Sequence, residues 1–164
     1  MQLPDPEQLL ADITSQIAPR ITANTALVGI HSGGVWLMQR ILQILNTEPE
    51  TGTLDAAMYR DDFAKRGLKN QPKPTNIGFE VEGKHIILID DIFYTGRTTR
   101  AAMNELFDYG RPAKIELAVL INRGGAELPI RPDIVGVDIP LAALQALELS
   151  QNTAGKLQLK LLDR

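Results

Sequence analysis

The sequence predicts an α/β protein with a mostly parallel central sheet and helices on both faces of that sheet. Three observations lead to this prediction. Short apolar runs alternate with segments of helical periodicity, a turn of small residues follows the first run, and the strongest apolar run ends in two acidic residues just before a helix. The 164 residues fit one hydrophobic core, so we expect a single domain over residues 1–164.

The first helix is indicated by its boundaries. Asp5 is a suitable capping residue, Pro6 suits the first helical position, and Pro19 ends the helix. One face of this segment is apolar and carries Leu9, Leu10, Ile13 and Ile17. We therefore expect the helix to pack that face on the core.

A strand, a tight turn and a second helix follow. The apolar run Ala26–Ile30 is typical of a parallel strand that is covered on both faces. Ser32, Gly33 and Gly34 come soon after the run and form a turn of small residues. The next apolar stripe has helical spacing and consists of Val35, Met38, Ile41, Leu42 and Leu45. This order is the first half of an α/β unit.

The middle of the chain is less regular. Residues 53–59 are predicted to form a further strand, and the stretch after them has no clear periodicity. Residues 60–76 contain Gly67, Pro72 and Pro74 together with several lysines and arginines. A structureless segment of this length inside a domain is usually functional or disordered. We therefore expect a flexible loop over about residues 60–76.

The second half of the chain returns to alternating strands and helices. Lys84–Asp90 is the strongest strand of the sequence, and a helix is expected over Thr98–Tyr109. Gly110 and Pro112 end that helix. The last three strands are predicted over residues 114–121, 134–138 and 157–161. The final strand alternates apolar and polar residues, so we expect it to close the sheet with one face exposed.

Composition excludes several kinds of site. The chain has no cysteine, which excludes disulfides, zinc ribbons and thiol nucleophiles. It has two histidines, His31 and His85, so a histidine-rich metal site is not expected. No apolar run reaches the roughly 18 residues of a membrane span, and the N-terminus lacks a signal pattern, so we expect a cytoplasmic protein without membrane contact. The formal net charge of −3 provides no overall attraction for nucleic acid.

Two acidic residues followed by a threonine-rich turn are the central feature for function. Asp90 and Asp91 stand at the expected carboxyl end of a buried strand, where open α/β sheets bind ligands. Thr95 and Gly96 then lead into a helix, and the N–H groups of such a turn suit a phosphate. Because carboxylates repel a phosphate, we expect the acidic pair to face a ribose diol instead. The alternative is that both residues only cap the next helix.

This run resembles a known binding motif. From Ile86 to Thr99 it has four apolar residues, two acidic residues, two apolar residues and a Thr-Gly-x-Thr turn, as in the phosphoribosyl diphosphate (PRPP) motif of type I phosphoribosyltransferases. Four segments, one of them within this motif, resemble one branch of these enzymes, namely Tyr59–Asp62, Tyr94–Thr98, Gly110–Pro112 and Glu127–Arg131. On these residues the sequence is identified as a member of the bifunctional pyrimidine operon regulatory protein / uracil phosphoribosyltransferase family.

The resemblance implies a fold and a reaction. The fold would be that of type I phosphoribosyltransferases, with a small hood beside the sheet. The reaction would convert uracil and PRPP to UMP and diphosphate with Mg²⁺, and some members of the family also regulate pyrimidine genes. We expect these four molecules as partners and a homo-oligomer as the assembled form. Two rival interpretations are transfer to another nucleobase and a nucleotide-sensing regulator with residual activity.

The resemblance also implies roles by position. Asp90 and Asp91 would bind the ribose hydroxyls and contact Mg²⁺, directly or only through ribose and water, and Arg60 would neutralise the departing diphosphate. In the diphosphate loop, the peptide bond after Ser32 would be cis. The 5′-phosphate loop would consist of Thr95, Gly96, Arg97, Thr98 and Thr99, the diphosphate loop of Ser32, Gly33 and Gly34, and the border of the base site of Asn122 and Arg123.

The sequence departs from the family pattern at a few positions. Well-studied members carry an arginine in the diphosphate loop where this chain has Gly33, which removes a charge-assisted contact to the leaving group. Gly125, Ala126 and Val137 stand where the RNA-regulating members have polar or basic residues. We therefore expect little RNA binding, although Arg131 remains.

Overall fold

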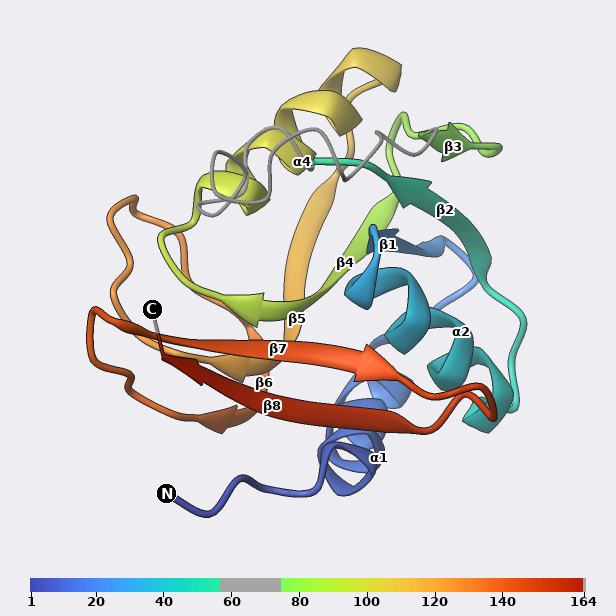
Figure 1. Cartoon of the computed structure of the whole chain (residues 1–164). Helices are drawn as coiled ribbons and strands as arrows, with labels where there is room; N and C mark the ends of the chain where they lie inside the picture. Colours follow the sequence, from blue (N-terminus) through green and yellow to red (C-terminus); the bar gives the residue numbers. More distant parts are fainter. Residues whose placement is uncertain (57–74, 164) are drawn as a thin grey trace.

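A six-stranded sheet forms the main layer of the computed structural model, which describes residues 1–56 and 75–163 (Figure 1). The strand order is β3-β2-β1-β4-β5-β6. Five strands run parallel to one another, and β3 runs antiparallel to β2. The strands are β1 (Thr25–Ile30), β2 (Glu50–Leu54), β3 (Asn76–Ile77), β4 (His85–Phe93), β5 (Lys114–Asn122) and β6 (Ile134–Asp138). The predicted mostly parallel sheet is confirmed.

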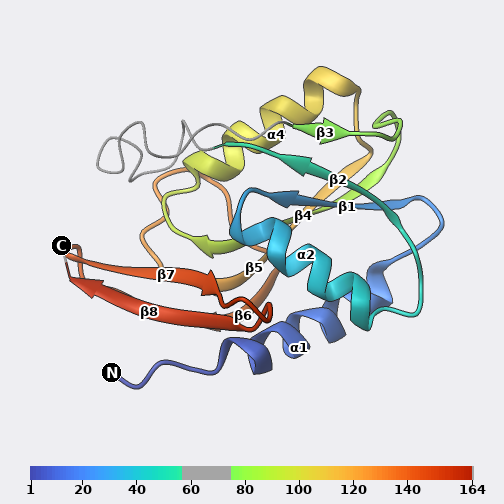
Figure 2. The same ribbon diagram turned by 45° about the vertical axis from the view of Figure 1, so that its right-hand side comes forward.

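Helices cover both faces of the sheet, also as predicted (Figures 1 and 2). One buried cluster joins α1 and α2 to the sheet, and a second cluster joins α4 to the opposite face. Among the described residues, no helix combines the length and the apolar character that crossing a bilayer requires. The helices are α1 (Pro6–Ile17), followed by a 3₁₀ turn at Ala18–Arg20, α2 (Gly33–Ile44) and α4 (Arg97–Tyr109).

Strand β4 lies in the middle of this arrangement, between β1 and β5. Ile87 and Ile89 enter the cluster under α1 and α2, whereas Ile86 and Leu88 enter the cluster under α4. All four side chains are fully buried, because successive residues of a strand point to opposite faces and both faces are covered. The continuous apolar run that precedes the acidic pair is explained by this double coverage.

The helix boundaries follow the predicted signals. The side chain of Asp5 accepts a hydrogen bond from the N–H of Glu7 at 3.0 Å, and Pro6 is the first residue of α1. Helix α4 begins at Arg97, one residue before the predicted start, because Gly96 takes the left-handed conformation (φ 97°) that turns the chain from strand to helix. These ends are fixed by local chemistry, which a sequence reveals directly.

The predicted strand over residues 53–59 is shifted. Strand β2 begins at Glu50 and ends at Leu54, and residues 57–59 lie outside the described part of the chain. Pairing with β1 sets these limits, since Ala26 lies opposite Glu50 and Ile30 opposite Leu54. The first residues of β2 are polar and exposed, so apolar periodicity did not indicate them.

The last strand does not close the main sheet. Strand β8 (Leu157–Asp163) pairs antiparallel with β7 (Gln145–Gln151) in a separate two-stranded sheet, which stands beside the main sheet as a small hood (Figure 1). Strand β7 was not predicted, because its alanine, leucine, glutamate and glutamine are all good helix formers. Leu147, Leu149 and Leu157 pack this sheet on the core beside α1.

An ion pair ties this small sheet to the two helices beneath it. Arg40 of α2 donates to both carboxylate oxygens of Glu7 in α1, at 3.0 and 2.5 Å, and to the carbonyl oxygen of Gly155 at 2.9 Å. The N–H of Leu157 donates to the same carboxylate at 2.8 Å. The hydrogen bond from Arg40 lowers the pKa of Glu7. One carboxylate therefore joins α1, α2 and the start of β8.

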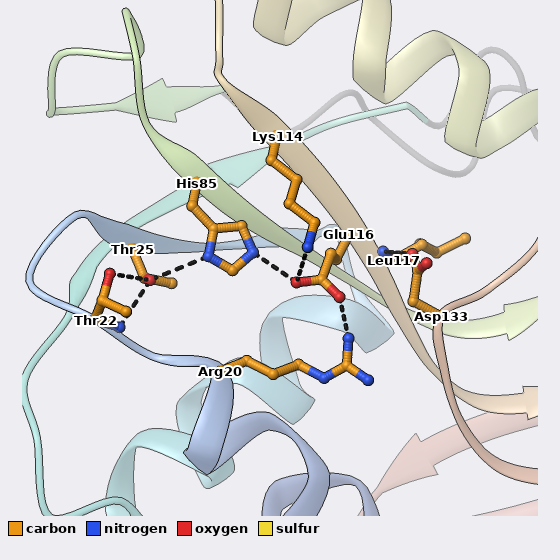
Figure 3. A network of polar contacts seen from close by, with 8 residues as sticks. All are labelled: Arg20, Thr22, Thr25, His85, Lys114, Glu116, Leu117 and Asp133. Atoms are coloured by element: carbon orange, nitrogen blue, oxygen red, sulfur yellow. Dashed lines mark hydrogen bonds and ion pairs between the residues drawn. The ribbon is translucent and has the colours of Figure 1, made fainter.

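A polar network closes the edge of the sheet at which β4 and β5 begin (Figure 3). The carboxylate of Glu116 is buried, accepts from Nε2 of His85 at 2.7 Å, and also pairs with Arg20 and Lys114. Nδ1 of His85 lies 3.2 Å from the hydroxyl of Thr25. Burial on its own raises the pKa of Glu116, but His85 and the two cations outweigh burial and leave the pKa below its ordinary value of 4.5. This network lies at the end of the strands opposite to the carboxyl ends, so its role is structural.

We predict that Glu116→Gln destabilises the protein by about 2 kcal/mol or more, because His85 and Arg20 lose a buried charged partner. A carboxyl group with a lowered pKa contributes stability above its unfolded pKa and loses that contribution as the pH falls through the folded value. The wild-type protein should therefore lose stability below about pH 4.5 more steeply than the variant. Urea unfolding between pH 3 and 7 measures both effects, with exposed Glu48→Gln as the control. Parallel pH profiles for wild type and Glu116→Gln would contradict the assignment.

Candidate functional site

Three turns meet at the carboxyl edge of the sheet. Strands β1, β4 and β5 are parallel neighbours, so the segments that follow Ile30, Phe93 and Asn122 leave the sheet at the same edge. This is the edge at which open α/β sheets bind ligands. Among the residues predicted for the site, all but Arg60 belong to the ends of these strands or to the turns after them. Arg60 lies outside the described residues.

The two acidic residues differ in exposure. Asp90 is buried, with 4% of its surface exposed, whereas Asp91 is half-buried. The N–H of Asp91 donates to Oδ1 of Asp90 at 2.9 Å, and the N–H of Ile92 donates to Oδ1 of Asp91 at 2.8 Å. Each carboxylate is thus anchored by the amide of the following residue. The outer carboxylate, that of Asp91, lies against Gly33 of the first turn.

The first turn, His31–Gly34, sits directly on the end of β4. The N–H of His31 donates to the carbonyl of Leu54 at 2.8 Å, which attaches the turn to β2 as well. A β-carbon on Gly34 would lie only 2.2 Å from the carbonyl oxygen of Ile89, so the backbone of α2 begins in contact with the backbone of β4. The predicted diphosphate loop and the acidic pair are therefore neighbours.

The cis peptide bond of this turn is not where the sequence analysis placed it. It joins His31 to Ser32, one bond before the expected position after Ser32. Gly33 is already the first residue of α2, and the carbonyl of Ser32 accepts the first helical hydrogen bond, from the N–H of Trp36 at 3.1 Å. The bond after Ser32 thus belongs to the helix, whose peptide bonds are trans.

The second turn, Thr95–Thr99, forms the start of α4. Thr95 and Thr99 are buried and Thr98 is half-buried, while the Arg97 side chain reaches outward and pairs with Glu127 at 2.6 Å. The N–H of Arg97 donates to the hydroxyl of Thr95 at 3.3 Å. A helix start presents N–H groups without partners inside the helix and a partial positive charge, which together favour an anion. The predicted phosphate turn therefore leads into the first turn of α4, a helix of 13 residues.

Arg123 follows β5, and its burial was not expected from the sequence. Its side chain is buried, and its Nε atom has no hydrogen-bond partner. The guanidinium lies over the ring of Tyr94, 3.8 Å from the ring centroid, which is a cation–π contact. Leaving a buried donor without a partner costs about 1–3 kcal/mol, so this atom is well placed for a ligand oxygen. The predicted contact of Arg123 with the base is compatible with this geometry.

Asn122 is held by protein contacts. Its Nδ2 atom donates to Asp138 of β6 at 2.8 Å, and its Oδ1 atom accepts from the N–H of Gly124 at 3.2 Å. Asn122 therefore shapes the third turn, which follows β5, through both ends of its amide.

The sequence analysis did not identify Tyr94 as the partner of Arg123. In the structure, Gly125 leaves room for the Tyr94 ring, because a β-carbon there would lie 2.8 Å from Cε2 of that ring.

The predicted flexible loop falls almost wholly outside the described residues, which resume at Thr75. The hydroxyl of Thr75 donates to Glu105 of α4 at 2.5 Å, and the N–H of Asp55 lies 3.4 Å from that hydroxyl. Asn76 already belongs to β3. Asp55 and Thr75, which lie on either side of the segment outside the described residues, are thus close together beside α4.

The site therefore combines two carboxylates, a helix start suited to an anion and a buried guanidinium. Residues 2–147 match the phosphoribosyl transferase domain family, and solved structures of similar fold agree with this match. A hypoxanthine-guanine phosphoribosyltransferase from Bacillus anthracis has a TM-score of 0.66 at 17% identity and covers 85% of this chain and 84% of its own. A hypoxanthine phosphoribosyltransferase from Trypanosoma cruzi has a TM-score of 0.63 at 21% identity, over 84% and 80%. The fold is that of type I phosphoribosyltransferases.

Curated relatives narrow the assignment. The Bifunctional protein PyrR of Pseudomonas fluorescens is 46% identical to this chain over 98% of both proteins. The protein of the same name from Pseudomonas savastanoi is 46% identical over 92% of this chain and 91% of its own. The chain belongs to the phosphoribosyl transferase domain family and, within it, to the PyrR group. The predicted enzyme class and the predicted family are thereby confirmed.

We predict that inorganic phosphate binds at the start of α4. Backbone amide signals of residues 96–99 should shift together as phosphate is added, because these N–H groups surround the anion. Helix α1 provides an internal control, since the carboxylate of Asp5 already occupies its start. A ¹⁵N-resolved NMR titration measures both regions. Equal shifts at the two helix starts, or none at residues 96–99, would contradict the anion site.

Proposed function

We propose that this protein transfers a phosphoribosyl group from PRPP to uracil, giving UMP and diphosphate. The observation that carries the proposal is the placement of the acidic pair of β4 between two turns suited to phosphate groups, His31–Gly34 and Thr95–Thr99. PRPP has a phosphate at one end, a diphosphate at the other and a ribose diol between them. The order of the groups in the ligand matches the order of the turns in the fold.

Each part of the site has one task in this proposal. The 5′-phosphate binds the start of α4 at Thr95, Gly96, Arg97, Thr98 and Thr99. The diphosphate binds the turn at Ser32, Gly33 and Gly34. Asp90 and Asp91 bind the ribose hydroxyls, and their negative charge favours the positive charge that develops at the anomeric carbon as the bond to diphosphate breaks. Arg60 lies outside the described residues, and its proposed contact with the diphosphate rests on the sequence alone.

In the proposed reaction one bond at the anomeric carbon breaks and one forms. The bond between the anomeric carbon and the diphosphate oxygen breaks, and that oxygen leaves with the electron pair. A nitrogen of uracil forms the new bond to the same carbon and loses its proton to solvent. Holding both reactants in line supplies much of the acceleration, so binding residues are enough to carry the step.

The residues present fit a magnesium ion that is held mainly by the substrate. Among the described residues, no group of three or more acidic or histidine side chains forms a metal cage. Two adjacent carboxylates are nevertheless what Mg²⁺ uses when substrate phosphates and water complete its coordination. Asp90 and Asp91 would contact it, directly or through ribose and water. When bound, such an ion supports the charge of the departing diphosphate.

Arg123 is proposed to border the base. A guanidinium offers only donors, so its unpartnered Nε atom suits a carbonyl oxygen, of which uracil has two. Tyr94 holds the guanidinium plane in place through the cation–π contact. Asn122, which is also proposed to border the base, supports this turn through Asp138. Transfer to another nucleobase is the rival proposal, since the fold itself is shared with purine-specific enzymes.

Regulation is the second candidate function, because the relatives bear the name of a bifunctional protein. Among the described residues, few cations lie near the turn that follows β5. Gly125 and Ala126 are exposed without charge, Val137 is half-buried, and Arg97 is paired with Glu127. Arg131 is exposed and remains a local cation. Assembly as a homo-oligomer and a cytoplasmic location stay predictions.

Purified protein should form UMP from uracil, PRPP and Mg²⁺, with hypoxanthine, guanine and cytosine at least about tenfold poorer acceptors. Asp91→Asn should lower turnover about 100-fold or more, because it removes a charge that acts on the transition state. Exposed Asp108→Asn on α4 is the matched control and should retain turnover. A chromatographic assay of UMP and diphosphate measures the reaction. Turnover of Asp91→Asn equal to that of the control would exclude the proposed role, and preference for a purine would favour the rival proposal.

Binding to the pyrimidine leader RNA of the host should be weak at physiological salt, with or without UMP. The net charge is −3, and each missing cation removes one phosphate contact and its share of the salt dependence. A filter-binding titration at two salt concentrations is the measurement. Nanomolar, UMP-dependent and sequence-specific binding would overturn this expectation and give regulation equal rank with catalysis.

A further inference from the structure

We infer that Arg123 is a catalytic residue that stabilises the negative charge which uracil acquires when its attacking nitrogen loses its proton. The inference rests on the proposed function, because it concerns the step in which uracil becomes the nucleophile at the same site. It goes beyond a contact that orients the base, since it assigns part of the acceleration to the positive charge of Arg123.

The chemistry of uracil creates the need for such a charge. When the N–H bond of the attacking nitrogen breaks, the proton goes to solvent water and the electron pair stays on the base. The negative charge then spreads from the nitrogen onto both carbonyl oxygens of the ring. The nitrogen forms its bond to the anomeric carbon, while the electrons of the old carbon–oxygen bond leave with diphosphate. A cation beside either carbonyl oxygen therefore lowers the cost of making the nucleophile.

Arg123 brings an uncompensated positive charge to this position. Only 6% of its surface is exposed, and a guanidinium cannot lose its charge in a protein. Among residues 1–56 and 75–163, no carboxylate forms an ion pair with it. Because buried charges in proteins are usually paired, this one suits a ligand that carries negative charge.

The carboxylates on the segments that border this turn have other partners. Asp138 at the end of β6 accepts from the amide of Asn122 at 2.8 Å, and Glu127 pairs with Arg97 at 2.6 Å. The acidic pair at the end of β4 is anchored by backbone N–H groups at 2.9 and 2.8 Å. None of these groups neutralises Arg123.

The contacts that hold Arg123 leave its charge intact. The guanidinium lies 3.8 Å from the centroid of the Tyr94 ring, and a cation–π contact attracts a cation without adding an anion. The backbone N–H of Arg123 donates to the carbonyl of Phe93 at 3.0 Å, and its carbonyl accepts from the N–H of Leu141 at 3.3 Å. The residue is thus fixed on two sides, while its Nε atom has no partner. A fixed donor that carries a full charge is the arrangement that stabilises charge developing in a transition state.

The pH dependence of a single turnover tests the inference. With PRPP, Mg²⁺ and saturating uracil, the rate should rise as bound uracil ionises. The half-maximal pH should lie at least about 1 unit below the pH at which free uracil is half ionised. 5-Fluorouracil, a stronger acid because fluorine withdraws electrons, should lower the half-maximal pH further, whereas titration of a protein group would leave it unchanged. Rapid quenching followed by chromatography of the nucleotide product measures the rate.

Variants of Arg123 separate its charge from its hydrogen bond. Arg123→Gln keeps a donor but removes the charge, so it should raise the half-maximal pH by about 1 unit or more with either base. Arg123→Lys keeps the charge but has no donor at the Nε position, and it should raise the half-maximal pH by about half a unit. Exposed Arg111→Gln, beside the opposite edge of the sheet, is the matched control and should leave it unchanged.

Three results would overturn the inference: the same half-maximal pH for uracil and 5-fluorouracil, the same value for the wild type and Arg123→Gln, or a wild-type value at or above that of free uracil. If Arg123→Gln does not fold, Arg123→Lys decides, and a half-maximal pH equal to that of the wild type refutes the inference. UMP formation by the wild type together with any of these results leaves the proposed function standing and the inference refuted. If the wild type forms no UMP at any pH, both fail.

Discussion

The direct contact between the start of α2 and the end of β4 is the constraint on which the site depends. Two successive glycines allow it: at Gly34 the helix backbone meets the strand backbone, and at Gly33 it meets the outer carboxylate. A larger residue at position 34 would push the start of the helix away from the strand backbone. The arrangement also relies on the apolar run of β4, which is buried on both faces and cannot shift to make room.

Charge explains the rest of the layout. Two carboxylates side by side repel each other and any phosphate, yet they lie between the two turns that we propose as phosphate sites. The amides of Asp91 and Ile92 each donate to one of the carboxylates and so stabilise the negative charge locally. The start of α4 contributes the opposite charge at the phosphate end. The separation of these charges along the sheet edge supports our proposal of a ligand with a neutral diol between two anionic ends.

The sequence predicted the parts of this protein that local chemistry decides. Asp5 with Pro6 marked α1, the run before Asp90 marked the central strand, and Gly96 marked the start of α4. It did not predict β7, whose residues favour a helix until the pairing with β8 makes them a strand. It placed the cis bond one position too late. It also did not join Arg123 to Tyr94, since that contact is between segments distant in the chain. The contact between Gly33 and Asp91 illustrates the same limit, because it is visible only in the folded chain.

A crystal structure with PRPP and Mg²⁺ tests the central claim most directly. We expect the 5′-phosphate within hydrogen-bond distance of the amides of residues 96–98, the ribose hydroxyls at Asp90 and Asp91, and the diphosphate at the His31–Gly34 turn. A PRPP molecule bound in the reverse direction, or at another edge of the sheet, would contradict the account.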